Sequence, residues 1–183
     1  MLSIASMTMR ELPVRKHPRL KGFDYSQCGS YYVTFCVIDR WELLGRVVVA
    51  GPGFHAQPVV ELTDIGIEVQ KTIEYIRNKD KYVDIPKYVV MPDHVHMIVV
   101  LGTPAVGDGT PSVGDGTPTL QSVVGRIKSY TAKIWCEMGG TKFQTFWQRS
   151  FHDRIIRNEA EYQRIWHYID KNPARWYEDR HRT

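Results

Sequence analysis

The sequence predicts an α+β domain in which a mainly antiparallel β-sheet carries helices packed on one face. Segments with the two-residue period of strands alternate along the chain with segments of helical period. Two apolar runs, residues 82–90 and 94–101, are separated by only three residues, and so short a connection joins only antiparallel neighbours. The 183 residues, 43% of them hydrophobic, suffice for one domain with a core and exclude a disordered chain or a fibre.

Two strands and one helix are expected before those runs. Residues 31–38, YYVTFCVI, are β-branched and aromatic, and residues 47–50, VVVA, follow closely enough to suggest a hairpin with them. From Thr63, a candidate N-cap, apolar residues recur at helical spacing over roughly 15 residues. These residues predict an amphipathic helix with a buried stripe of Ile65, Val69, Ile73 and Ile76.

A helix, a strand and a last helix are expected after the two runs. Residues 120–135, LQSVVGRIKSYTAKIW, have helical spacing and a basic exposed side, and residues 151–157 suggest a short strand. Asn158 followed by Glu161 is a capping-box signature, which opens a helix that Pro173 is expected to end.

The composition divides the chain into three parts. Residues 1–29 are interpreted as a basic N-terminal arm, residues 30–177 as the domain and residues 178–183 as a tail. Within the domain, residues 106–119 form a seven-residue tandem repeat, VGDGTPS-VGDGTPT, which is too rich in Gly, Pro and Asp to build a packed element. Residues 103–119 are therefore expected to be a flexible surface insertion, and their spacing fits no phosphate-binding loop.

Both ends of the chain are basic around an acidic middle. Residues 1–25 hold five basic and two acidic side chains, and residues 126–183 hold twelve and seven, although the formal net charge is only +4. This pattern suggests a polyanionic partner, with a merely solvated surface as the alternative. Three widely spaced cysteines suit a reducing, cytoplasmic compartment, and no apolar run approaches the length of a membrane span.

His94 and His96 are the sharpest local feature. Residues two apart in a strand face the same side, so the two imidazoles project together while Val95 faces the other side. Such a pair can share one divalent cation; the alternative is two histidines on a solvated face, although polar rings weaken an otherwise apolar strand. With no cysteine nearby, a closed zinc site is disfavoured, and the open positions suit Mg²⁺ or Mn²⁺ acting on a phosphodiester.

Tyr168 lies on the polar face of the expected last helix. The buried stripe of that helix consists of Tyr162, Ile165, Trp166 and Ile169. On a helical wheel Tyr168 is roughly 110° from the centre of the stripe, beside Glu161 and Asn172. A surface tyrosine is the plain interpretation. The functional one is a tyrosine nucleophile, with the Asn172 amide one turn later offering an oxygen to the same cation.

Three stretches of the sequence resemble the single-tyrosine HUH transposases, and most closely the REP-associated tyrosine transposases of bacteria. They are YVVMPDHVHMIVVL at 88–101, GRIKSYTAKIW at 125–135 and FWQRSFHDRIIRNEAEYQRIWHYIDKNPARW at 146–176. The similarity covers about residues 20–176. It implies a ferredoxin/RRM-like antiparallel sheet that carries the HUH pair on a central strand, with the tyrosine on a C-terminal helix.

The resemblance also implies an activity and its residues. The HUH histidines correspond to His94 and His96, the nucleophile to Tyr168, and the third metal ligand, on the same helix, to Asn172. The implied reaction is metal-dependent cleavage and rejoining of single-stranded or hairpin DNA through a 5′-phosphotyrosine, with Mg²⁺ or Mn²⁺ as the cofactor. Tyr130 is the competing tyrosine, but its place in the stripe of its own helix favours packing.

Phosphate contacts are expected from the arm and from the basic helix. The candidate residues are Arg10, Arg15, Lys16, Arg19, Lys21, Arg126, Lys128 and Lys133. Trp147 and Trp176 would either stack on splayed bases or pack in the core. A protein of this kind would act in the bacterial cytoplasm, on the nucleoid when bound to DNA, and the sequence is compatible with a monomer or a homodimer.

Two other functions fit parts of the pattern. A histidine-triad nucleotide hydrolase also uses closely spaced histidines, but position 98, where a third alternate histidine would stand, is Ile98. A domesticated DNA or RNA hairpin binder on the same fold would cleave nothing, and would need neither the histidine pair nor Tyr168.

Overall fold

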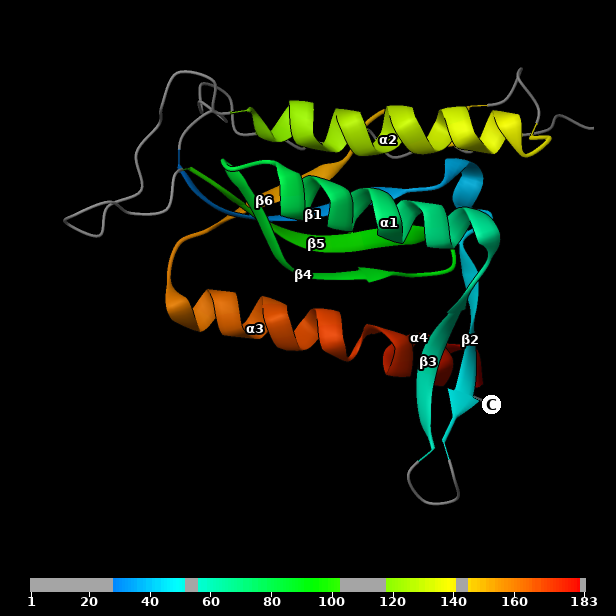
Figure 1. Ribbon diagram of the computed structural model, residues 1–183. Coiled ribbons are helices and arrows are strands. Elements are labelled where there is room, and N and C mark those ends of the chain that lie inside the picture. Colours follow the sequence, from blue (N-terminus) through cyan, green and yellow to red (C-terminus); the bar gives the residue numbers. More distant parts are fainter. Residues whose placement is uncertain (1–27, 52–55, 103–117, 141–144, 182–183) are drawn as a thin grey trace, which may run out of the picture.

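The structure, a computed structural model, describes residues 28–51, 56–102, 118–140 and 145–181. Its centre is a four-stranded antiparallel sheet in the order β4-β5-β1-β6, and a ribbon of β2 and β3 extends away from it (Figure 1). The strands are β1 (Gly29–Cys36), β2 (Gly45–Ala50), β3 (Gln57–Leu62), β4 (Val83–Val90), β5 (His94–Leu101) and β6 (His152–Ile156). The helices are α1 (Asp64–Lys79), α2 (Leu120–Glu137), α3 (Glu159–Asp170) and α4 (Asn172–His181), and a short 3₁₀ turn spans Ile38–Arg40.

The two faces of the central sheet are covered by different helices. α1 and α2 cover one face (Figure 1). On that face alternate residues of β1 and β5, among them Phe35 and Met97, are fully buried in the main core. α3 lies against the other face, where Ile98, Ile156 and Ile169 form a smaller buried cluster. The predicted α+β class is confirmed, with the histidine pair on the central strand β5. Helices cover both faces, however, and not one.

The predicted hairpin between residues 31–38 and 47–50 is wrong. β1 pairs with β5 on one side and with β6 on the other, and β2 pairs instead with β3, a strand that the sequence did not predict. β1 is apolar enough to be buried between two long-range partners, and the chain leaves the sheet after it through the 3₁₀ turn. Proximity along the chain therefore did not decide the pairing.

The helix ends match the predicted caps, with one difference. The Thr63 hydroxyl accepts a hydrogen bond from Gly66 N–H at the start of α1, and Asn158 Oδ1 accepts one from Glu161 N–H at the start of α3. The last helix, however, ends at Asp170, and a further helix, α4, begins at Asn172. Pro173 thus lies in the first turn of a new helix, where its missing N–H removes no intrahelical bond.

Two predicted segments lie largely outside the described residues. Of the basic arm at 1–29 only residues 28 and 29 are described, and of the insertion at 103–119 only residues 118 and 119. Within the part that is described, no helix combines the length and the apolarity needed to cross a bilayer.

Candidate functional site

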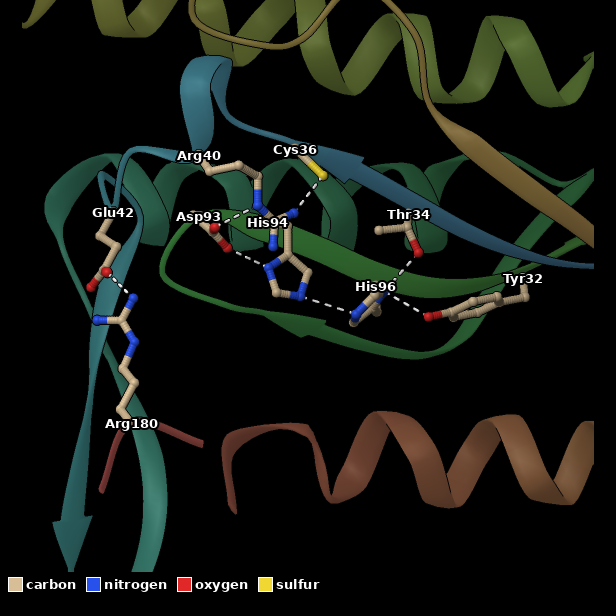
Figure 2. A network of polar contacts seen from close by, with 9 residues as sticks. All are labelled: Tyr32, Thr34, Cys36, Arg40, Glu42, Asp93, His94, His96 and Arg180. Atoms are coloured by element: carbon tan, nitrogen blue, oxygen red, sulfur yellow. Dashed lines mark hydrogen bonds and ion pairs between the residues drawn. The ribbon is translucent and has the colours of Figure 1, made fainter. Parts of the chain in front are cut away.

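The two histidines of β5 converge on one point at the sheet face that α3 covers. His94 is 5% exposed and His96 is 6% exposed. Their Nε2 atoms are 3.0 Å apart, and the rings meet nearly edge to face, with an interplanar angle of 75° (Figure 2). Both side chains project from the same face of the strand, as their spacing predicted.

Asp93 fixes the orientation of His94. Asp93 Oδ1 lies 2.5 Å from His94 Nδ1, and the second carboxylate oxygen, Oδ2, lies 2.7 Å from Arg40 Nε (Figure 2). Because an ionised carboxylate only accepts hydrogen bonds, this contact favours the tautomer of His94 with the proton on Nδ1. In that tautomer Nε2 presents a lone pair towards His96.

Two hydroxyl groups of β1 hold His96 from the other side. Tyr32 Oη and Thr34 Oγ1 each lie 2.7 Å from His96 Nδ1, and the Tyr32 ring stacks on the imidazole with centroids 5.5 Å apart. Thr34 lies directly opposite His96 in the antiparallel register, which places its hydroxyl there. Burial, with His94 and Arg40 nearby, lowers the pKa of His96 to about 3, so this imidazole is neutral at physiological pH.

The donor set fits a divalent cation. Two nitrogens bound to one cation at about 2.1 Å lie about 3 Å apart when they meet near a right angle, which is the separation of the two Nε2 atoms. The other ring nitrogen of His94 contacts a carboxylate, a usual outer partner of metal-binding histidines, and that of His96 contacts two hydroxyls. The described residues contain no cluster of three His, Cys, Asp or Glu side chains around a common point, so further ligands would be amide, water or phosphate oxygens.

Tyr168 of α3 lies over the histidine pair. Its ring meets His96 at a centroid distance of 5.3 Å and meets Tyr32 edge-on at 6.2 Å, and it remains 37% exposed. The Arg175 guanidinium lies 5.2 Å from the centre of the same ring. Part of the face expected to be polar thus faces the sheet, since Tyr168 contacts His96 and Glu161 is buried.

α4 carries two of the residues that the sequence singles out, Asn172 and Trp176. Asn172 is 6% exposed and begins α4, so it does not lie on the helix of Tyr168 as the resemblance implied. The Trp176 ring lies 5.7 Å from that of His94, and the Arg180 guanidinium is 4.5 Å from the centre of the indole. Trp176 therefore borders the site. Trp147 is a core residue, 5% exposed, whose Nε1 donates to Thr131 Oγ1.

Two of the basic residues predicted on α2, Arg126 and Lys133, lie away from this site. Arg126 pairs with Asp80 at 2.7 Å and Lys133 with Glu137 at 3.7 Å, and both line a hollow of about 870 Å³ between α1 and α2 on the far face of the sheet. Lys128 is partly buried, and its ammonium donates to the carbonyls of residues 148–150. The predicted packing role of Tyr130 is wrong: Tyr130 is 55% exposed, and Thr131 takes the buried position.

Sequence reasoning missed five residues of the site: Tyr32, Thr34, Arg40, Asp93 and Arg175. Asp93 could have been found, because it directly precedes His94. The two β1 residues depend on the strand register, and the two arginines depend on how a turn and a helix pack. Of the residues predicted for the chemistry, the structure brings His94, His96 and Tyr168 together.

Sequence comparison finds a relative of the chain but no family. No family model matches the chain. A protein of Haemophilus influenzae described as uncharacterised is 29% identical over 174 residues, which cover 90% of this chain and 91% of that protein.

One solved structure aligns over most of the chain. It is described as a REP-associated tyrosine transposase bound to a REP hairpin, with a TM-score of 0.55 and 21% identity over 88% of this chain and 74% of that one. A second structure, provisionally described as a transposase of Deinococcus radiodurans, aligns at a TM-score of 0.42 and 15% identity over 84% of this chain and 95% of that one, too low to add to the argument. The fold expected from the resemblance is confirmed: the chain folds like that REP-associated transposase.

Proposed function

We propose that this protein cleaves and rejoins single-stranded or hairpin DNA, with Tyr168 as the nucleophile. The observation that carries the proposal is the position of the Tyr168 ring against His96, over two imidazoles whose Nε2 atoms converge. A tyrosine whose role was only to pack would not need a pair of inward-facing ring nitrogens beneath it. The transposase fold of the solved relative agrees with this chemistry.

The proposed step is a transesterification. The Tyr168 oxygen attacks a backbone phosphorus, the new bond from tyrosine oxygen to phosphorus forms, and the bond from phosphorus to the 3′ oxygen breaks. The phenolic proton leaves to solvent or a nearby base, and the 3′ oxygen takes up a proton. The product is a 5′-phosphotyrosine with a free 3′-OH, and attack by a 3′-OH reverses the step without an external energy source.

His94, His96 and the Asn172 amide would hold Mg²⁺ or Mn²⁺ in this scheme. Such a cation supplies charge neutralisation and polarisation at the scissile phosphate. The chain's own groups orient the reacting atoms. Tyr32 and Thr34 hold His96, Asp93 holds His94, and the burial of both imidazoles excludes bulk water from them.

DNA is proposed to lie along the site between α3 and α4. The REP-associated relative is described with a hairpin, which supports a hairpin substrate for this chain. Arg175 is exposed beside Tyr168 and suits a backbone phosphate, whereas Trp176 offers an aromatic surface to an unpaired base. These two residues, and not Arg126 or Lys133 on the far face, are the DNA contacts proposed at the site.

Replacement of the nucleophile tests the proposal. Tyr168→Phe removes one oxygen, so we expect it to abolish the covalent protein–DNA adduct on a labelled hairpin while non-covalent binding survives. Tyr130→Phe is the matched control, because Tyr130 is an exposed tyrosine on the far face, and it should form the adduct like the unaltered protein.

The possible outcomes separate the proposal from its rival. An adduct that persists in the Tyr168→Phe variant refutes the nucleophile. Hairpin binding by the unaltered protein with no adduct under any Mg²⁺ or Mn²⁺ concentration favours a non-cleaving binder.

A further inference from the structure

The turn after β1 has a backbone conformation that side-chain-bearing residues rarely adopt. Asp39 has a φ of 50° and Arg40 a φ of 59°, so two consecutive residues lie in the left-handed region. Strained backbone of this kind persists only where surrounding contacts determine it, and it is concentrated at functional sites. The contacts that hold this turn therefore indicate what it does.

Backbone hydrogen bonds tie the turn to the residues that lead into the histidine strand. Val37 N–H donates to the Asp93 carbonyl at 2.8 Å, and Leu44 N–H donates to the Pro92 carbonyl at 2.9 Å. The two bonds flank Arg40 in the sequence. They bring the turn directly beside Asp93, the residue before His94.

The Arg40 side chain is held at two points. Its Nε lies 2.7 Å from Asp93 Oδ2, and its Nη1 donates to Cys36 Sγ at 2.8 Å (Figure 2). The Asp93 carboxylate is buried, with a side chain 5% exposed, and its two oxygens are divided between Arg40 and His94. A planar guanidinium with two fixed partners orients that carboxylate more tightly than a single contact would.

We infer that Arg40 is a positioning residue for the histidine pair. Through Asp93 it holds His94 as the tautomer with the proton on Nδ1, so that the Nε2 lone pair faces His96. The strained turn is the means by which the arginine reaches the carboxylate. The inference rests on the proposed metal-assisted function, because it gives the Arg40–Asp93 pair the role of orienting His94, a proposed ligand of the cation.

Nuclear magnetic resonance of the imidazoles tests the tautomer in the full chain without metal or DNA. Long-range ¹H–¹⁵N spectra of the unaltered protein should show His94 protonated at Nδ1. Arg40→Gln should give a mixture of both tautomers, and Arg40→Lys, which keeps the charge, should restore part of the Nδ1 form. Arg46→Gln is the control, because Arg46 makes a comparable ion pair with Glu61, at 2.6 Å, on the β2–β3 ribbon.

Titration with Mn²⁺ alone gives the second readout. Loss of an outer partner typically weakens metal binding by about 10-fold to 100-fold, and since Arg40 acts through Asp93 we expect about 10-fold for Arg40→Gln and no change for Arg46→Gln. Unchanged tautomer and unchanged Mn²⁺ affinity in folded Arg40→Gln overturn the inference, as does His94 protonated at Nε2 in the unaltered protein. Neither readout requires cleavage. If Arg40→Gln weakens Mn²⁺ binding but the unaltered protein forms no adduct through Tyr168, the proposed function fails and the inference stands.

Discussion

The two imidazoles depend on partners from opposite sides of β5. Asp93, in the connection between β4 and β5, orients His94, and two hydroxyls of the neighbouring strand β1 orient His96. Each ring keeps one nitrogen for these partners and turns the other inward. The pair therefore presents two inward nitrogens, and loss of either ring would leave only one.

Removal of one imidazole should eliminate the metal dependence of the reaction. His94→Ala deletes one of the two converging nitrogens, so we expect hairpin cleavage to fall by at least 10-fold, with no recovery at high Mn²⁺ concentration, while hairpin binding remains. The measurement is adduct yield as a function of Mn²⁺ concentration. His152→Ala is the control, because His152 is an exposed histidine on β6 of the same sheet. If the adduct yield of His94→Ala depends on Mn²⁺ concentration as that of the unaltered protein does, the histidine pair is not the metal site.

The histidine pair could be predicted from the sequence because its geometry is local. Two residues two apart in a strand share a face whatever the rest of the fold does. Tyr32 and Thr34 could not be found this way, since they meet His96 only through the pairing of β1 with β5 across more than 60 residues. Tyr168 was identified on the correct helix, but its contact with His96 depends on the packing of α3 against the sheet.

At the scale of elements, the sequence predicted those with a clear internal period and missed those defined by distant partners. Thr63 and Asn158 begin α1 and α3 as expected, because caps depend on residues within one turn. β3 was missed because QPVVEL contains a proline and is only half buried, and it pairs with the projecting strand β2, away from the main core. The wrong β1–β2 hairpin has the same cause, since no local pattern shows that β1 is central.

The packing of α1 against the chain before it depends on a single glycine. A Cβ at Gly66 would lie 1.9 Å from the Leu44 carbonyl oxygen, a backbone atom that cannot rotate away. Gly66→Ala should therefore destabilise the protein by about 2 kcal/mol in urea unfolding, although alanine favours a helix by about 1 kcal/mol.

Gly125 provides the control for that substitution. It lies in α2 with no atom within 4 Å of its built Cβ, so Gly125→Ala should stabilise by about 0.5–1 kcal/mol. Opposite signs for the two substitutions support the close contact, and stabilisation by both contradicts it.

The start of α3 should be sensitive to acid. Glu161 accepts a hydrogen bond from Arg157 N–H at 3.0 Å and pairs with Arg154 at 2.5 Å, and these contacts lower its pKa below the ordinary 4.5. A carboxyl group with a lowered pKa in the folded state stabilises the protein above its unfolded pKa and loses this effect as the pH falls through the folded value. The free energy of unfolding of the unaltered protein should exceed that of Glu161→Gln at pH 7, and the gap should shrink at pH 3. A gap of constant size contradicts this assignment.

At the scale of the whole molecule, the sheet separates the histidine site from two of the basic residues predicted to contact DNA. α3 lies on one side of the sheet, and α1 and α2 lie on the other (Figure 1). The histidine site lies on the α3 face, whereas Arg126 and Lys133 line the hollow between α1 and α2. Both of these cations already pair with carboxylates. The composition showed that the C-terminal third is basic, but it could not show on which side of the sheet each basic residue would lie.

Charge variants on the two faces should therefore differ in their effect on DNA binding. Arg175→Gln, beside Tyr168, should weaken hairpin binding and lower the slope of log affinity against log salt by about 1, because one phosphate contact is lost. Lys133→Gln should leave both quantities unchanged. If Lys133→Gln has the larger effect, bound DNA reaches the far face, as the sequence alone suggested. Fluorescence anisotropy over a series of salt concentrations measures both variants.

The cores on the two sides of the sheet differ in size, and this difference sets the order in which parts of the molecule unfold. The α1–α2 side contains the large cluster around Phe35 and Met97. The cluster on the α3 side is smaller: Ile169 is buried there with Ile98 and Ile156, and the other apolar residues of α3 are only partly buried. Partial unfolding begins where the least apolar surface must be exposed. The amides of α3 should therefore exchange with deuterium well before those of β5. The helix that carries Tyr168, the proposed nucleophile, is accordingly expected to detach from the sheet at a lower free energy than the strand that carries the two histidines.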